Sequence, residues 1–233
     1  MKKVVILLFL VCVTGFAQKM DYKNYNAFLK KYISENGNVD YDKIKTNKAE
    51  LEKIINEFDA TQPVNKNWPK NEELAYFINV YNINTIKIVV DNYPTKSIKD
   101  IKNAWDKKFI LSGKALLSLS DVEHKILRKM NEPRIHFAIN CASFSCPKLE
   151  NKAFEPKILD SQLETATKAF INDKTKNIIS TKEVQLSEIF NWFGSDFKTK
   201  KTSIIDFINK YSTVKIDKKA KVKYLDYNWD LNK

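Results

Sequence analysis

Arginine and histidine are scarce in this sequence, although it is strongly basic. Only two of its forty basic residues are arginines, it has two histidines, and its formal net charge is +12. A basic protein invites a nucleic-acid function, but arginine is the residue that forks onto phosphates and guanine edges. The lysines are scattered through every segment, and no nucleic-acid motif is present. We therefore expect no nucleic-acid partner, and an anionic envelope polymer or surface only as a general electrostatic partner.

Long apolar runs are lacking except at the start of the chain. Two lysines open the sequence, residues 4–13 carry no charge, and the small residues Gly15 and Ala17 follow. This order is typical of a secretory signal peptide, and about ten apolar residues are too few for a membrane-spanning helix, which needs about twenty. We predict that residues 1–17 are a cleavable signal peptide and that residues 18–233 form one domain in the periplasm or outside the cell, with no stable membrane insertion after cleavage.

Two alternatives remain for the start of the chain. The apolar run could be kept as a membrane anchor, for which it is short. Cys12 could instead carry a lipid, but Val11 before it is bulky where a small residue is expected.

The rest of the sequence predicts an α+β fold. The content of 43% hydrophobic and 12% aromatic residues is well above that of a disordered chain. Apolar residues at helical spacing alternate irregularly with short strand patterns, which favours a mostly helical α+β domain with a small mixed or antiparallel sheet. The expected helices cover residues 22–33, 51–58, 71–92, 121–130 and 160–170, with two short ones after Ser187 and Ser203. The expected strands are hairpins within 109–119 and 178–186 and a single strand over 134–140.

Two of these elements carry further expectations. Ser120 and Glu123 have the spacing of a capping box at the start of helix 121–130. Asn79 and Asn82 share one face of helix 71–92, and buried amides need partners, so this face either braces a loop or lines a site. We expect a cleft between this face and residues 121–146.

The scarce residue types gather in one window of the chain. Acid–base, nucleophilic and metal chemistry mostly draw on these side chains. Residues 124–146 contain both arginines (Arg128 and Arg134), both histidines (His124 and His136) and two of the three cysteines (Cys141 and Cys146).

Three interpretations of this window stay open. Cys141 and Cys146 could form a local disulfide, because an exported protein meets an oxidising compartment. Alternatively, one cysteine is a nucleophile and a histidine its base, with Asn140, Glu123 or Asp121 orienting that base. A zinc site from two histidines and two cysteines lacks the paired spacings of structural zinc sites, so we expect no metal and no other cofactor.

Three side-chain sets also have simpler interpretations. His124 lies beside Asp121 and Arg128 at helical spacing, as on an ordinary charged surface. His136 would be half-exposed on a strand. The aromatic residues of 224–229 could form a shelf for a ligand, but a C-terminal strand that closes the core is the preferred interpretation.

Four separated motifs carry a resemblance to a known family. They are Tyr-Phe-Ile-Asn-Val-Tyr-Asn at 76–82, Leu-Ser-Asp-Val-Glu-His ending at Arg128, the block 134–147 with both cysteines, and Tyr-Asn-Trp-Asp-Leu-Asn at 227–232. In this order they resemble the bacterial domain of unknown function 547 family. The resemblance implies no defined activity, and this tail departs from the family in carrying Asn228 and Asp230 around Trp229. It implies family motif positions at Asn79, Asn82, Glu123, His124, Arg128, His136, Cys141 and Cys146.

Two functions follow as expectations. The favoured one is thiol-dependent hydrolysis or acyl transfer on an envelope peptide or amide, by analogy with papain or transglutaminase. The alternative is a non-enzymatic binding or scaffold domain with a Cys141–Cys146 disulfide, whose partner is an envelope peptide, polymer or protein. The predicted catalytic residues are Cys141, Cys146, His136, His124, Glu123 and Asn140, with Cys141 preferred as the nucleophile because it adjoins Asn140. The predicted binding residues are Asn79, Asn82, Arg128 and Arg134.

Overall fold

The computed structural model describes residues 19–62 and 68–233. The predicted signal peptide, including Cys12, lies outside the described residues. No helix in the described part of the chain is both long and apolar enough to cross a bilayer.

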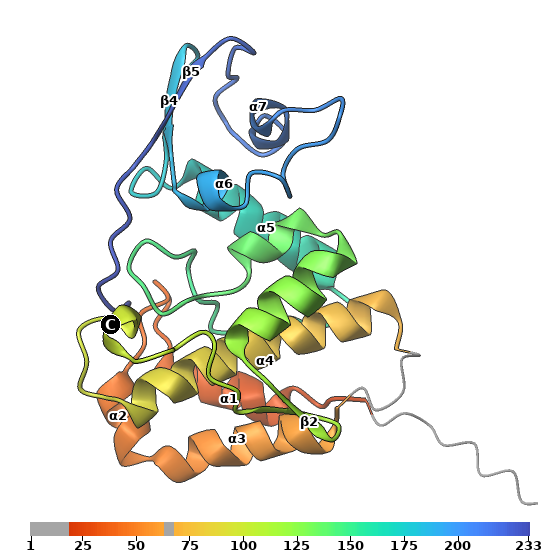
Figure 1. Cartoon of the computed structure of the whole chain (residues 1–233), viewed down its shortest axis with the longest axis vertical. Coiled ribbons are helices and arrows are strands. Elements are labelled where there is room, and N and C mark those ends of the chain that lie inside the picture. Colours follow the sequence, from red (N-terminus) through yellow and green to blue (C-terminus); the bar gives the residue numbers. More distant parts are fainter. Residues whose placement is uncertain (1–18, 63–67) are drawn as a thin grey trace, which may run out of the picture.

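Four helices form a layer in the lower half of Figure 1. They are α1 (Lys23–Tyr32), α2 (Tyr41–Thr46), α3 (Lys48–Ala60) and α4 (Lys70–Asp91). In α1 the buried residues are Tyr25, Phe28, Leu29 and Tyr32, at the helical spacing that predicted the helix. In α4, sixteen residues between Leu74 and Val90 are buried. The prediction of a long helix here is confirmed, and α4 is the element around which this layer packs.

A series of short elements follows α4. They are the 3₁₀ turn η1 (Ile98–Asp100), the hairpin β1 (Ile110–Ser112) and β2 (Ala115–Leu117), and the helical turns η2 (Asp121–Ile126), η3 (Leu127–Met130) and η4 (Pro133–Phe137). The hairpin is confirmed, with Gly113 at φ +61° in its turn, where a left-handed conformation favours glycine.

The predicted capping box at Ser120 and Glu123 is wrong. Ser118 caps this helical segment instead: its hydroxyl accepts the Asp121 N–H, and the Asp121 carboxylate accepts the Ser118 N–H, both at 3.0 Å. Ser118 and Ser120 are two residues apart, so the sequence alone did not show which of them caps the helix. Glu123 is therefore free of any capping role.

The predicted strand over 134–140 is also wrong. The segment starts with a 3₁₀ turn, in which Pro133 takes the first position and the Glu132 carboxylate accepts the Arg134 N–H. Its residues from Ile135 to Asn140 are all buried, so its alternating polar residues face protein and not solvent. One such residue is His136, which is only 3% exposed where the sequence predicted a half-exposed side chain.

The remaining elements occupy the upper half of Figure 1. They are α5 (Leu159–Asn172), β3 (Ile178–Ile179), β4 (Glu183–Leu186), α6 (Ile189–Trp192), α7 (Ile204–Ile208) and β5 (Lys221–Tyr224). Strand β4 lies between β3, to which it is antiparallel, and β5, to which it is parallel. The predicted helix 160–170, the hairpin 178–186 and the short helices after Ser187 and Ser203 are confirmed, and the α+β class with them.

The buried apolar residues form two clusters. One fills the helical layer, and the other gathers around Phe137, Phe170, Phe190, Phe197 and Phe207 beneath the three-stranded sheet. Neighbouring residues of η4 belong to different clusters: Ile135 to the first and Phe137 to the second. The turn that carries His136 thus lies where the two cores meet.

The C-terminal tail runs from β5 back to the helical layer (Figure 1). It forms single bridges from Asp230 to Ser97 and from Leu231 to Ser143. The expected C-terminal strand is present only as β5, whose residues are all exposed, but Tyr227 and Trp229 after it pack against the two cores, so that interpretation is confirmed in part. The tail after β5 crosses the cysteine loop.

Candidate functional site

A cavity of about 190 Å³ opens between the two cores. Five of the predicted site residues line it: Glu123, His124, His136, Cys141 and Cys146. Aromatic side chains make up much of the rest of its wall: Tyr81, Trp105, Trp192, Phe193, Tyr227 and Trp229. Folding thus places an acid, two imidazoles and two sulfur atoms around one small space.

The cysteine loop forms one edge of this cavity. The Cys141 and Cys146 sulfurs lie at bonding distance as a disulfide, with their Cα atoms 6.3 Å apart. Between them Ala142 adopts φ +59°, an uncommon conformation for a residue with a side chain. It is held there because its N–H donates to Asn140 Oδ1 at 2.7 Å and its carbonyl accepts the Asn232 N–H at 3.3 Å. The loop conformation therefore depends on residues both before and far after it in the chain.

The Cys146 sulfur is surrounded by hydrogen-bond donors. The Cys141 N–H lies 3.0 Å from it, and the Ser143 and Tyr227 hydroxyls each lie 3.2 Å away. The single Ser143 hydroxyl hydrogen has a second acceptor, Tyr227 Oη at 3.1 Å; turned toward Cys146, it makes three donors on one sulfur. Because neutral sulfur is a weak acceptor, this environment is suited to a thiolate. Burial raises the pKa of Tyr227 well above its ordinary value, which keeps this donor protonated. Cys146 is only 4% exposed, whereas Cys141 is partly exposed.

His136 is held by a carboxylate that the sequence did not single out. Its Nε2 lies 2.9 Å from Asp196 Oδ2, and its ring stacks on Phe193 with the centres 4.2 Å apart. Burial lowers the pKa of His136, although the Asp196 carboxylate opposes this shift. The imidazole is therefore neutral at pH 7, and we assign the Nε2 proton to the hydrogen bond with Asp196.

The other ring nitrogen of His136 remains open to the cavity. Nδ1 makes no hydrogen bond within the described residues. Among those residues, every side-chain nitrogen or oxygen that is completely shielded from solvent does have a hydrogen-bond partner. Nδ1 therefore keeps some exposure, and the space that His136 lines is this cavity. A neutral imidazole with its lone pair on Nδ1 is an acceptor for a proton from a group bound there.

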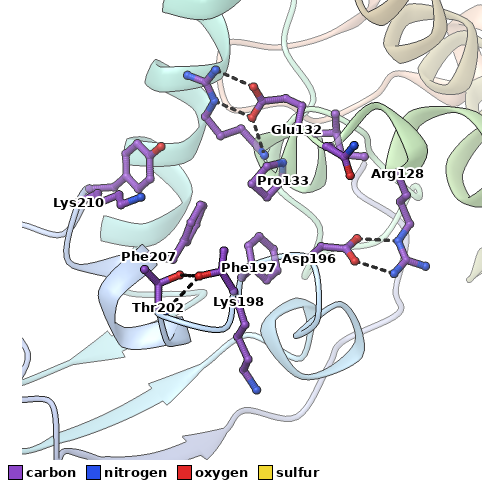
Figure 2. Close-up of a pocket in the computed structure, with 14 residues that line it drawn as sticks. Arg128, Glu132, Pro133, Asp196, Phe197, Lys198, Thr202, Phe207 and Lys210 are labelled. Carbon is purple, nitrogen blue, oxygen red and sulfur yellow. Dashed lines mark hydrogen bonds and ion pairs between the residues drawn. The ribbon is translucent and has the colours of Figure 1, made fainter.

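Asp196 is itself anchored by an arginine. Arg128 donates from Nε at 2.6 Å and from Nη2 at 2.8 Å, a two-pronged contact drawn in Figure 2. Burial would raise the pKa of Asp196, but the hydrogen bonds from Arg128 and His136 outweigh it and hold this pKa well below its usual range. Arg128 therefore contacts Asp196 and does not itself line the cavity of the two cysteines.

Glu123 is a buried acid on the other side of the cavity. It lies in η2, a π-helical turn, a rare local structure often found at functional sites. The Tyr81 hydroxyl donates to its Oε2 at 3.2 Å. Burial raises the pKa of Glu123 to about 7, against the opposing effects of Tyr81 and Arg128. Its Oε1 has no hydrogen bond within the described residues. Because completely shielded side-chain oxygens there all have hydrogen-bond partners, Oε1 keeps access to the cavity.

His124 sits at the rim and is exposed. Its Nδ1 lies 3.3 Å from Arg128 Nη1. Burial of the ring lowers the pKa of His124, and the positive charge of Arg128 lowers it further. Asp121, which could have oriented it, pairs with Lys125 instead. Of the two histidines, only His136 has a carboxylate partner.

The three predicted asparagines brace loops and do not line this cavity. Asn79 bonds both backbone groups of Phe154, at 2.8 and 3.0 Å. Asn82 bonds the Ala138 carbonyl at 2.9 Å and the Asn140 N–H at 2.9 Å. The Asn140 side chain in turn donates to the Pro147 carbonyl at 2.7 Å. Only Asn82 faces the 121–146 segment as expected, and Asn79 faces the next loop.

Arg134 lies at a second, separate cavity of about 400 Å³ (Figure 2). Its guanidinium pairs with Glu132 and Asp160, each at 2.8 Å. Asp196 lines this second cavity, as does Arg128. Arg134 is therefore not part of the cysteine-lined site.

The predicted zinc alternative does not assemble. In residues 19–62 and 68–233, no group of three or more His, Cys, Asp or Glu side chains is placed to hold a metal ion. The two sulfurs are joined to each other, and the two histidines contact Asp196 and Arg128.

Sequence reasoning missed Asp196 and the aromatic wall. Asp196 is one of 28 acidic residues and lies in a turn 60 residues from His136, so nothing local marks it. For Tyr227 and Trp229 the sequence did give an indication, since one interpretation of the aromatic residues in 224–229 was a shelf for a ligand. Their place in the cavity supports that alternative.

Comparison with known proteins gives one family match. Residues 65–171 match the family described as "Protein of unknown function, DUF547". The match supports the resemblance found in the sequence, and the description carries no activity. The matched segment contains Glu123, both histidines and two of the three cysteines, Cys141 and Cys146, but it ends before Asp196 and Tyr227. No curated protein and no solved structure matches the chain.

Proposed function

We propose that this protein is a thiol-dependent hydrolase or acyl transferase that acts on a peptide or amide. The observation that carries the proposal is the shared cavity: His136, oriented by Asp196, lines the same small space as Cys146 with its three donors. A nucleophile, a base and a group that orients the base are the parts of a thiol-catalytic site.

The proposed reaction starts from the reduced pair. Cys146 Sγ loses its proton to His136 Nδ1 and attacks the substrate carbonyl carbon. The leaving amine takes that proton from His136, and a thioester to Cys146 remains. Water then gives a proton to His136 and attacks the thioester, which releases the acid and the Cys146 thiolate. An amine acceptor in place of water gives acyl transfer.

We assign the nucleophile to Cys146 and not to the initially preferred Cys141. The reason for preferring Cys141 was Asn140, whose amide is committed to Pro147 and the cysteine loop. The donors converge on Cys146 instead. Cys141 Sγ has only longer contacts, 3.4 Å to Ser143 and 3.5 Å to Tyr227.

The disulfide is then a stored form of the enzyme. A thiolate of an external dithiol attacks the more exposed Cys141 sulfur, and Cys146 leaves as the thiolate that the three donors stabilise. The second thiol of the reductant resolves the mixed disulfide, so that the reductant is oxidised and both cysteines become thiols. The reaction therefore needs a dithiol in the compartment where the protein works.

The rival function is a binding domain whose cysteines stay paired. The bonded sulfurs favour it, because a disulfide in a short loop fixes the loop and offers no nucleophile. The two functions differ in whether reduction creates a reactive thiol.

The deciding experiment is acylation by p-nitrophenyl acetate before and after treatment with dithiothreitol, followed by intact-mass analysis. We expect one acetyl group on the reduced protein, none on the oxidised protein and none on Cys146→Ser. His136→Ala should slow acylation. If reduction creates two thiols that react no faster than free cysteine, the binding-domain function replaces this one.

We further propose that the protein is exported and loses residues 1–17. The Cys141–Cys146 disulfide supports this, since such bonds persist in oxidising compartments. Intact mass after expression in an exporting host tests it, with Gln18 expected as the first residue. A mass that includes residues 1–17, or lipid on Cys12, would contradict export by this route.

A further inference from the structure

The aromatic wall of the cavity is more extensive than thiol chemistry requires. Trp192, Tyr227 and Trp229 pack as a group, with ring centres 4.6 to 5.7 Å apart, and Trp105 meets Trp229 edge-on at 5.8 Å. All four line the cavity, and Trp192 is 46% exposed. Aromatic side chains that belong only to a core are usually better covered than this.

The chain already places cations on rings at the borders of this wall. The Lys99 ammonium lies 5.4 Å from the centre of the Trp229 ring, and the Arg128 guanidinium 5.2 Å from that of Phe193. Neither cation lines the cavity. The negative faces of indole rings attract cations, and tryptophan does so most strongly.

A single acid completes the lining. Glu123 is the only carboxylate that lines the cavity within the described residues, and its Oε1 keeps access to the space. The two histidines that share the lining have lowered pKa values, caused first by burial, and are neutral at pH 7. Among the described residues, the lining thus combines aromatic side chains with one carboxyl group and no lysine or arginine.

We propose that this cavity binds an organic cation, an alkylated or primary ammonium group, between the aromatic wall of Trp105, Trp192 and Trp229 and the carboxylate of Glu123. Aromatic cages with an acidic residue recognise such groups. The cavity volume of about 190 Å³ is below the roughly 300 to 1,000 Å³ of pockets for drug-sized ligands, so it fits a head group and not a large ligand. Cation binding itself does not rest on the proposed function. Only the assignment of the ammonium group to the amide substrate rests on it.

Cation binding should depend on pH through Glu123. The groups that face it are Tyr81 on α4, Arg128 on η3, Asp196 in the turn after α6, and Tyr227 on the tail. Burial raises the pKa of Glu123 to about 7, and the cation binds its ionised form. Affinity should therefore rise between pH 6 and pH 8, and a proton should be released on binding at pH 6.

The test compares choline with its neutral isostere 3,3-dimethylbutan-1-ol, by tryptophan fluorescence and calorimetry on the oxidised full chain. We expect choline to bind roughly tenfold more tightly than the alcohol, since only the charge differs. Glu123→Gln should weaken choline binding roughly tenfold and remove its pH dependence. Trp192→Leu should weaken it as well, whereas Glu150→Gln, at a residue that does not line the cavity, should have no effect.

Two results would overturn the inference. Equal binding of choline and the alcohol would mean that the cavity is merely apolar, and failure of both to bind would mean that it is not a site for this head group. Because the oxidised chain has no free thiol in this cavity, neither result bears on acylation of Cys146. Conversely, failed acylation of the reduced chain leaves choline binding unaffected.

Discussion

His136 and Asp196 are 60 residues apart in the chain, and their side chains share a hydrogen bond of 2.9 Å. Both oxygens of the same carboxylate also accept hydrogen bonds from Arg128. One side chain therefore fixes the orientation of the histidine and neutralises the arginine. It also joins the turn after α6, in the upper half of the molecule, to η3 and η4.

Replacing this carboxylate tests how much it stabilises the fold. Asp196→Asn keeps the shape but removes the charge, and we expect the free energy of unfolding at pH 7 to fall by about 2 kcal/mol, as for a lost charge-assisted hydrogen bond. The pKa of Asp196 is lowered in the folded state. Its contribution is therefore complete above the unfolded pKa of about 4 and is lost as the pH falls towards the folded value.

Urea unfolding of both proteins at pH 7 and pH 3 measures this effect. The difference in stability between the natural protein and Asp196→Asn should narrow at pH 3. Asp226→Asn, a substitution outside this network, should show no such trend. A difference that stays constant with pH would mean that Asp196 does not act through its charge.

Glu123 should give the opposite pH dependence. Burial raises its pKa to about 7, so between its unfolded pKa of about 4.3 and pH 7 the folded protein holds a proton that the unfolded chain has lost. Stability should therefore fall as the pH rises through this window, by an amount on the order of 2 to 3 kcal/mol.

Glu123→Gln should abolish that loss. The variant keeps an oxygen to accept the Tyr81 hydroxyl, so we expect it to match the natural protein at pH 5 and to exceed it at pH 8. Thermal unfolding across this range is the measurement, with Glu150→Gln as the matched control. If the unfolding temperatures of Glu123→Gln and the natural protein changed in parallel with pH, ionisation of Glu123 would not destabilise the folded protein.

The long elements of this fold could be predicted because their signals are local. The 22 residues of α4 are apolar on nearly every side, and the spacing of Tyr25, Phe28, Leu29 and Tyr32 defines α1. The segment around His136 could not be predicted in the same way. Its alternation favours a strand, but no strand in the described part of the chain pairs with it. The Asn82 amide instead bonds the backbone groups of Ala138 and Asn140 that a strand partner would have bonded.

The candidate site was predictable only in part, for a related reason. His136, Cys141 and Cys146 are rare residue types close together in the chain, so composition alone singles out their window. Asp196 comes from a distant turn and Tyr227 from the tail, and only the meeting of the two cores brings Asp196 to His136 and Tyr227 to the cavity. Acids and tyrosines are too common in this chain for a single one to be noticed.

Asn82 and Asn79 brace different loops, so a substitution of each one serves as the control for the other. Asn82→Ala leaves the Ala138 carbonyl and the Asn140 N–H without partners, which should cost roughly 2 to 4 kcal/mol. Amide exchange should become faster over residues 138–146, as measured by mass spectrometry. Asn79→Ala should do the same around Phe154 and leave the cysteine loop protected. If both variants loosen the same region, the separate bracing of these two loops is wrong.

The hydroxyls around Cys146 give the last prediction. In the reduced protein, the Cys141 N–H, Ser143 and Tyr227 should stabilise the Cys146 thiolate and lower the pKa of this thiol. A hydrogen bond to a charged group contributes roughly 1.5 to 3 kcal/mol, so removing one should raise that pKa by about one unit or more. Tyr227→Phe and Ser143→Ala remove one hydroxyl each.

The measurement is the rate of iodoacetamide alkylation against pH after reduction, with the modified cysteine located by peptide mapping. We expect Cys146 to react at lower pH than Cys141, and both variants to shift the Cys146 profile upward. Tyr224→Phe, on the exposed strand β5, should leave it in place. If Tyr227→Phe changes the oxidised protein's unfolding midpoint but not the alkylation profile, the hydroxyl supports the loop only, and the thiolate must be stabilised by another group or not at all.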